Sequence, residues 1–151
     1  MPSDVARWAP RLTLPLALTG LGLSTYLTWE HYSTSTTLSC PDTGVVNCLK
    51  VTTSAQSLVF GVPVALLGAI FFAAMASLCL PPLWRANSDQ VRLLRLGGAI
   101  SGIAMVLYLV AVELIVVRAI CLWCTAVHLV AFGLFVAVLA AFLQPDDRKR
   151  A

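Results

Sequence analysis

The sequence contains few charged residues and few histidines. Only 11% of its 151 residues are Asp, Glu, Lys or Arg, whereas a soluble domain usually has about 25%. Hydrophobic residues make up 59% of the chain and the mean hydropathy is +0.87, so we expect an integral membrane protein with no large soluble domain. The net charge of +3 gives no support to nucleic-acid binding. The two histidines form no zinc-type cluster, which makes metal binding the weakest explanation for the five cysteines.

Motifs for bound redox cofactors are also missing. The segment Cys121-Leu122-Trp123-Cys124 is followed by Thr125 instead of the histidine of a c-type haem motif. The chain contains no flavin motif and no Gly-rich nucleotide loop. Electrons that enter the cysteines must therefore leave through another acceptor. A lipid-soluble quinone that reaches the C-x-x-C from within the bilayer is the natural candidate.

Four apolar stretches predict an all-α integral membrane fold, a bundle of four transmembrane helices in a single domain of residues 1–151. An outer loop at 30–58 bears two cysteines and is expected to contain a short interfacial helix. An inner loop at 81–92 joins the second and third spans, and residues 144–151 form a charged tail. The four expected spans are residues 12–29, 59–80, 93–117 and 120–143.

The first span has an alternative interpretation. An Arg-flanked apolar stretch near the N-terminus could be a signal peptide. However, no clear small-x-small cleavage site follows residues 12–29, and Tyr26 and Trp29 are typical of an interfacial aromatic anchor. We therefore expect this stretch to span the membrane.

The basic residues predict the orientation of the bundle. If the N-terminus is cytoplasmic, only Lys50 and Arg118 lie on the outer side. The eight basic residues on the inner side would be Arg7, Arg11, Arg85, Arg92, Arg95, Arg148, Lys149 and Arg150. Because an excess of Lys and Arg marks the cytoplasmic side, we expect cytoplasmic N- and C-termini and cysteines outside the cytoplasm.

Four of the five cysteines then face one oxidising compartment, in two pairs. Cys121 and Cys124 lie at the start of the fourth span, where the helix dipole favours a thiolate and the spacing gives a strained, easily reduced disulfide. Cys40 and Cys48 lie in the outer loop and could simply staple it. Two pairs on the same side suggest instead a relay by thiol–disulfide exchange. Cys79, near the other end of the second span, is expected to be a small buried hydrophobic residue.

Quinone reduction needs proton donors near the ring. Glu113 is an ionisable residue within the third span, which favours a functional role over a carboxylate that merely reaches the interface. His128 follows Cys124 by one helical turn and is either a proton donor or a packed histidine. Ser54, Phe60 and Trp123 could complete a quinone pocket, although aromatic residues here could equally be interfacial anchors.

A wider pattern unites these features: Cys40-x7-Cys48, Ser54, Phe60-Gly61-Val62-Pro63-Val64, Glu113, and Cys121-Leu122-Trp123-Cys124-Thr125 with His128. The pattern resembles the bacterial, disulfide-forming (DsbB-like) branch of the vitamin K epoxide reductase family, over about residues 12–143. The resemblance implies a four-helix membrane bundle around a quinone pocket that is capped by the outer loop. It also implies a protein of the bacterial inner membrane that oxidises a DsbA-type or thioredoxin-like partner outside the cytoplasm and reduces a quinone.

The resemblance assigns roles to individual residues. Cys121 and Cys124 correspond to the catalytic pair, with Cys124 facing the quinone. Cys40 and Cys48 correspond to the shuttle pair, in which Cys48 exchanges with Cys121 and Cys40 meets the substrate protein. The quinone-binding residues would be Ser54, Phe60, Glu113, Trp123 and His128.

Two departures from the family refine these expectations. Many bacterial relatives carry a fused thioredoxin-like domain, and this chain has none, so a separate partner is expected. The animal enzymes have a tyrosine where His128 stands, which favours plain quinone reduction over vitamin K epoxide reduction. The alternatives are a vitamin K epoxide or quinone reductase with a thiol donor, or a non-enzymatic membrane subunit with structural disulfides. Menaquinone, ubiquinone and a vitamin K-type quinone all remain open as acceptors.

Overall fold

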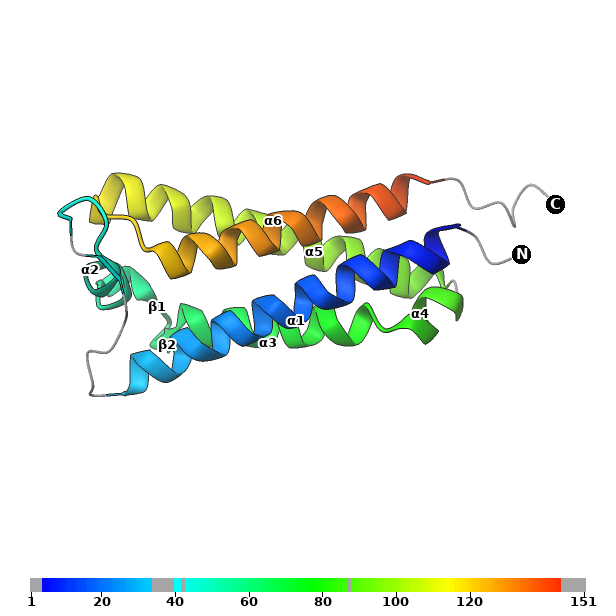
Figure 1. The fold of residues 1–151 in the computed structure, drawn as a ribbon, viewed down its shortest axis with the longest axis horizontal. Coiled ribbons are helices and arrows are strands. Elements are labelled where there is room, and N and C mark those ends of the chain that lie inside the picture. The colour runs from blue at the N-terminus through cyan, green and yellow to red at the C-terminus, as the bar shows by residue number, and fades with distance from the viewer. Residues whose placement is uncertain (1–3, 34–39, 42, 87, 145–151) are drawn as a thin grey trace.

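The computed structural model describes residues 4–33, 40–41, 43–86 and 88–144, and these residues are mostly helical. The long helices lie side by side and form an elongated bundle (Figure 1). They are α1 (Asp4–Tyr32), α3 (Val64–Leu78), α5 (Asp89–Ala111) and α6 (Leu122–Leu143). Helix α1 packs against α3 and α6, and α5 packs against α6 and α3. Helix α5 continues directly into a π-helical segment, η2 (Val112–Val117).

Short elements gather at both ends of the bundle (Figure 1). One end holds α2 (Cys48–Thr52), the 3₁₀ turn η1 (Ala55–Ser57) and a hairpin of β1 (Leu58–Val59) and β2 (Val62–Pro63). The opposite end holds α4 (Pro81–Ala86). The cysteine-bearing loop therefore caps one end of the helices.

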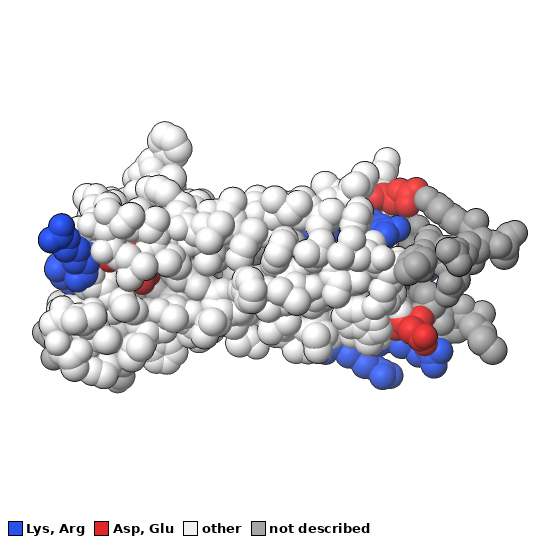
Figure 2. Space-filling view, turned by 90° about the horizontal axis from the view of Figure 1, so that it is seen from above, with Lys and Arg blue, Asp and Glu red and all other residues white. Residues whose placement is uncertain are grey.

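Two helical segments of the described residues, Asp89–Val117 and Leu122–Leu143, are long and apolar enough to cross a membrane. Helix α3 is apolar but shorter. Charged side chains lie toward the two ends of the face in Figure 2, and the middle of that face is uncharged. This pattern fits a protein that lies across a bilayer, whereas the expected count of four spans remains a prediction.

Because of the β-hairpin, α3 begins later in the chain than expected. The second span was expected from residue 59, but the helix begins at Val64. Phe60 and Gly61 have φ angles of 51° and 80°, which are typical of the two central residues of a tight hairpin turn. The turn reverses the chain, Pro63 then precedes the first helical residue, and Leu58 pairs with Pro63.

Helices also occupy more of the chain than the expected spans do. Helix α1 begins at Asp4 instead of residue 12 and contains Pro10 and Pro15. The expected inner loop at 81–92 contains α4 and the first turn of α5. Pro81 is the first residue of α4, a position where proline is well tolerated because its missing N–H has no intrahelical partner.

Glycines bring α3 close to its neighbours. A Cβ atom on Gly98 would lie 2.7 Å from the Met75 Sδ atom, and one on Gly102 would lie 2.5 Å from the Phe71 ring. The Gly98-x-x-x-Gly102 pair on α5 thus accommodates large α3 side chains. On α1, a Cβ on Gly20 would lie 2.3 Å from the Phe72 ring. These contacts build the apolar core between the helices.

We expect Gly20→Ala to destabilise the bundle by about 1–3 kcal/mol, because the new methyl group would overlap the buried Phe72 ring. Gly22 is the matched control, since it lies on the same helix with no atom within 4 Å of a Cβ at that position. Gly22→Ala should be neutral or stabilising by up to about 1 kcal/mol. Thermal unfolding in detergent measures both changes. Equal melting temperatures for the two variants would contradict the proposed packing.

Two arginines cap helix ends on the α4 side. The Arg95 side chain is 4% exposed and donates Nε–H and Nη2–H to the Leu78 carbonyl oxygen at 3.1 and 2.8 Å. Its guanidinium group lies 3.6 Å from the centre of the Trp84 ring. Arg92 donates to the Phe142 carbonyl oxygen and stacks on the Phe142 ring. These arginines thus satisfy carbonyl groups that α3 and α6 leave unpaired at their C-terminal ends.

Candidate functional site

The outer loop is joined directly to the segment that precedes α6. The Ile120 N–H donates to the Val45 carbonyl oxygen at 2.8 Å, and the Asn47 N–H donates to the Ile120 carbonyl oxygen at 3.1 Å. These two bonds form a parallel bridge between Val46 and Ile120. Cys48 and Cys121 follow directly on this bridge. The structure therefore brings together two cysteines that lie far apart in the sequence.

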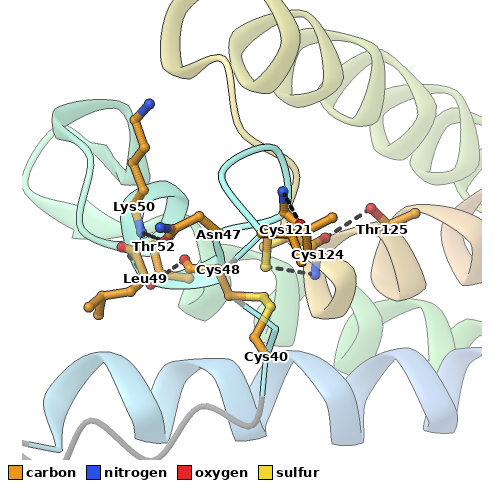
Figure 3. The surroundings of a disulfide bond; sticks show 11 residues. Cys40, Asn47, Cys48, Leu49, Lys50, Thr52, Cys121, Cys124 and Thr125 are labelled. Atoms are coloured by element: carbon orange, nitrogen blue, oxygen red, sulfur yellow. Dashed lines mark hydrogen bonds between the residues drawn. A yellow bond between two sulfur atoms is a disulfide. The ribbon is translucent and has the colours of Figure 1, made fainter.

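The loop cysteines form a disulfide. The Cys40 and Cys48 sulfur atoms are 2.03 Å apart, with 6.0 Å between the Cα atoms. Cys48 is 1% exposed, whereas Cys40 is half-buried. Figure 3 shows the Cys121 sulfur pointing toward this disulfide. Another protein could therefore approach the disulfide at Cys40, while Cys48 is buried.

Cys121 is the N-cap residue of α6. Its Sγ atom accepts a hydrogen bond from the Cys124 backbone N–H at 3.2 Å. Thr125 secures the first turn, because its N–H and its hydroxyl donate to the Cys121 carbonyl oxygen at 2.8 and 2.9 Å. Cys121 and Cys124 are free thiols, the first buried and the second half-buried. The C-x-x-C therefore opens the last helix, at the cap that holds the loop disulfide.

Hydrogen bonds at this helix start favour the charged form of Cys121. A bond from the Cys124 thiol has the largest effect and lowers the pKa of Cys121, whereas burial opposes it. The backbone N–H groups of Cys124 and Trp123 also lower this pKa, and the nearby Glu113 raises it. The net result is a Cys121 pKa below the ordinary value for a thiol. Cys121 is therefore well suited to thiolate chemistry.

This shift predicts how the reduced C-x-x-C pair titrates. In a variant whose other three cysteines are alanine, a first thiolate should form below the ordinary cysteine pKa of about 8.5, because a lowered pKa keeps the charged form at lower pH. Adding Cys124→Ala removes the hydrogen bond that lowers the Cys121 pKa most, so the Cys121 thiolate should appear at higher pH. Ultraviolet thiolate absorbance against pH measures both curves. Coincident curves would contradict the role of the Cys124 thiol.

Glu113 lies in the π-helical segment at the end of α5. Its side chain is 6% exposed, and its carboxylate accepts a hydrogen bond from the Cys121 backbone N–H. Its carbonyl oxygen accepts the Ala119 N–H at 3.2 Å. The segment ends at Arg118, which has a left-handed φ of 52°. π-Helical turns are frequent at functional sites, and this one sets an acidic side chain against the C-x-x-C.

A cavity of about 340 Å³ lies between the helices and the cap. Residues of α1, α3, α5, η2 and α6 line it together with the segment that runs from α2 to β2. Most of the lining is apolar, with a few polar side chains, as is common in small-molecule sites. Among the described residues, no group of three or more His, Cys, Asp or Glu side chains is placed to hold a metal ion.

The cavity brings together most of the residues that the sequence predicted for a quinone pocket. Ser54, Glu113 and His128 line it, and so does Cys124. Cys121 is fully buried beside the loop disulfide and is not among the lining residues.

Two of the predicted pocket residues do not line the cavity. The Phe60 side chain is fully exposed at the tip of the β-hairpin. Trp123 packs against Tyr26 of α1, with 4.9 Å between the ring centres. This contact agrees with a structural position for Trp123 at the end of the bundle.

Two polar cavity residues were not predicted from the sequence. His31 lies in the last turn of α1, and Gln56 lies in η1. Neither belongs to a recognisable motif, and no periodicity distinguishes them from other polar residues of the outer segment. Only the folding of that segment over the helix ends brings them to the cavity.

The chain matches the sequence model of the Vitamin K epoxide reductase family over residues 11–139, which is most of its length. No curated protein matches it.

Proposed function

The chain belongs to the vitamin K epoxide reductase family, and from this premise we propose that it oxidises a thioredoxin-like (DsbA-type) protein outside the cytoplasm and passes the electrons to a quinone. Membership of the family makes it an integral membrane oxidoreductase of thiols, disulfides and quinones. The direction of electron flow, the partner and the role of each cysteine are proposals.

One observation supports the proposal above all: the Val46–Ile120 bridge joins the two cysteine pairs. Cys121 points toward the loop disulfide (Figure 3), and Cys124, one turn further along α6, lines the cavity. A relay of electrons from the outer surface to a membrane ligand needs both contacts: Cys121 must reach the loop disulfide, and Cys124 must reach the ligand. Two disulfides with a purely structural role would need neither contact.

The first exchange takes place at the loop. A thiolate of the reduced partner attacks the Cys40 sulfur and breaks the Cys40–Cys48 bond. The partner's second thiol then displaces Cys40, so the partner leaves as a disulfide and the loop becomes a dithiol. The half-buried Cys40 suits this attack better than Cys48, which is 1% exposed.

The second exchange passes the electrons inward. When Cys121 and Cys124 form a disulfide, the Cys48 thiolate attacks Cys121 and frees Cys124, and Cys40 then attacks Cys48 and frees Cys121. The loop disulfide is restored and the C-x-x-C holds two thiols. The structure has this arrangement of one loop disulfide and two free thiols.

The last exchange takes place at the cavity. The cavity fits a quinone, because it is largely apolar, has a few polar side chains and includes a thiol. A bound quinone accepts two electrons and two protons and leaves as a quinol. Cys124 supplies the electron pair, Cys121 closes the disulfide with Cys124, and the thiols release two protons. Glu113 and His128 line the same cavity and are the candidates for carrying these protons.

A direct assay tests this function. Purified protein in detergent should reduce a short-chain ubiquinone or menaquinone in the presence of a reduced thioredoxin-like protein, with one quinol formed for each partner disulfide. Absorbance of the quinone and thiol trapping of the partner measure the two products. A protein that reduces vitamin K epoxide but neither quinone would favour epoxide reductase activity, and failure with all three acceptors would contradict the proposal.

The orientation proposed for the chain agrees with this relay. With both termini in the cytoplasm, the α2 end faces the outer compartment, where Cys40 can meet its partner. The capping arginines Arg92 and Arg95 then lie at the cytoplasmic end. The inner basic residues at 148–150 lie outside the described residues.

A further inference from the structure

Four of the five hydroxyl groups that line the cavity have already donated their hydrogens to the backbone, and the fifth, Ser24, is 1% exposed and lies against Gly68. Ser54 donates to the Val51 carbonyl oxygen at 2.8 Å, and Ser57 donates to the Ser54 carbonyl oxygen at 2.7 Å. Thr52 donates to the Cys48 carbonyl oxygen at 2.9 Å, and Ser101 donates to the Gly98 carbonyl oxygen at 2.9 Å. A hydroxyl has a single hydrogen. In this arrangement these four side chains can accept a hydrogen bond from a ligand but cannot donate one.

A quinone needs hydrogen-bond donors, which these hydroxyl groups do not provide. Its two carbonyl oxygens only accept hydrogen bonds, so each requires an N–H or O–H donor from the protein. The Glu113 carboxylate receives the Cys121 backbone N–H, and the proposed function assigns Glu113 and His128, which both line the cavity, to proton transfer. The serine predicted for the pocket, Ser54, is thus a poor donor, and we expect donors among lining side chains that neither bond to the backbone nor carry the reaction's protons.

Gln56 and His31 are free to donate. Both are half-buried and line the same cavity as Cys124. Within the part of the chain that the structure describes, neither side chain makes a hydrogen bond, and His31 has only an edge-on ring contact with Tyr32. A primary amide carries two N–H groups, and a neutral imidazole carries one. They also approach from different elements, Gln56 from the cap and His31 from α1.

We propose that Gln56 and His31 donate the hydrogen bonds that hold the quinone carbonyl oxygens in the cavity beside Cys124. This inference rests on the proposed function and adds the residues that recognise the ring. It also explains why the cap carries an amide among hydroxyl side chains whose hydrogens are committed to the backbone. The ligand class that fits is a ring with two acceptor oxygens and an apolar body.

Steady-state kinetics with a short-chain ubiquinone and dithiothreitol test the inference. Gln56→Met keeps the side-chain length but removes the donor, so KM for the quinone should rise about threefold to tenfold, with a smaller change in kcat. His31→Phe should do the same, and the double variant should lose more than either. Thr53→Ala is the matched control in the cap, because Thr53 is exposed, does not line the cavity and donates its hydrogen to the Leu49 carbonyl oxygen, so its KM should stay within about twofold.

A spectroscopic measurement reports the hydrogen bonds themselves. With a quinone isotope-labelled at its carbonyl carbons, the bound carbonyl stretch should lie at lower frequency than in detergent alone. In Gln56→Met and in His31→Phe, one carbonyl band should move back toward the unbound frequency. A structural role for either residue would not move this band while the protein remains folded.

The outcomes separate this inference from the function on which it rests. If the wild-type protein reduces no quinone, the proposed function fails. If the wild type is active but Gln56→Met and His31→Phe leave KM and the carbonyl bands unchanged, or if Thr53→Ala raises KM as much, only the present inference is overturned. If Gln56→Met does not accumulate, Gln56→Glu replaces it. Its carboxylate cannot donate at neutral pH, so an unchanged KM would also overturn the proposal.

Discussion

Replacing Cys121 or Cys124 by alanine should abolish quinone reduction, with a loss of roughly a thousandfold or more. A dithiol supplies two electrons by closing a disulfide, and a lone cysteine at this position has no partner with which to close it. The expected loss therefore concerns the reaction itself, and raising the quinone concentration should not restore activity. The measurement is the rate of quinol formation with the reduced partner and with dithiothreitol.

The two variants should differ in what they accumulate. In Cys124→Ala, the Cys121 thiolate still faces the loop disulfide (Figure 3), so a Cys48–Cys121 cross-link should build up and be identifiable by mass spectrometry of digested protein. In Cys121→Ala this cross-link cannot form. Cys79→Ala is the control, because Cys79 is buried at the far end of α3 and should tolerate the change. Activity in Cys124→Ala, or a cross-link to Cys40 in place of Cys48, would contradict the relay.

The sequence was sufficient for the parts of this protein that depend on composition and order along the chain. The apolar stretches predicted a helical membrane protein, and the family match and the two long apolar helices support this. The spacing of Cys121 and Cys124 predicted a C-x-x-C at a helix start, where the structure has it. These features are local, because a helix start needs only a few consecutive residues.

Contacts between distant segments could not be predicted in the same way. The Val46–Ile120 bridge joins backbone groups of two irregular segments, and no side-chain pattern signals it. The π-helical segment around Glu113 also has the composition of an ordinary apolar helix. The direction of the Ser54 hydroxyl depends on the local turn, so the sequence could suggest Ser54 for the pocket but not its bond to the Val51 carbonyl oxygen.

Phe60 shows how a sequence motif and the backbone geometry can point to different positions for a side chain. Its position beside Gly61 in a family motif suggested a pocket aromatic, but a positive φ at both residues makes the pair a hairpin turn. The turn carries the ring to the surface, where it is fully exposed. A contribution of Phe60 to quinone binding stays a prediction, and it would require the hairpin to fold toward the cavity.

Cys40→Ala should block oxidation of the protein partner and leave quinone reduction by dithiothreitol largely intact. A folded partner can approach only sulfur atoms near the surface, and Cys48 and Cys121 are 1% and 0% exposed. With Cys40 absent, the partner has no accessible disulfide to attack. A small dithiol can instead enter the cavity and reach Cys124, which lines it.

The two substrates together make this variant decisive. We expect the rate with the reduced thioredoxin-like protein to fall at least about a hundredfold, because the alternative path requires local unfolding of the cap. The rate with dithiothreitol should change by less than about threefold, which shows that the quinone site and the C-x-x-C remain intact. Cys48→Ala should have the same pattern, since the loop disulfide needs both sulfur atoms. Wild-type activity of Cys40→Ala with the protein partner would mean that electrons enter through the C-x-x-C directly, and the loop pair would then be a structural staple.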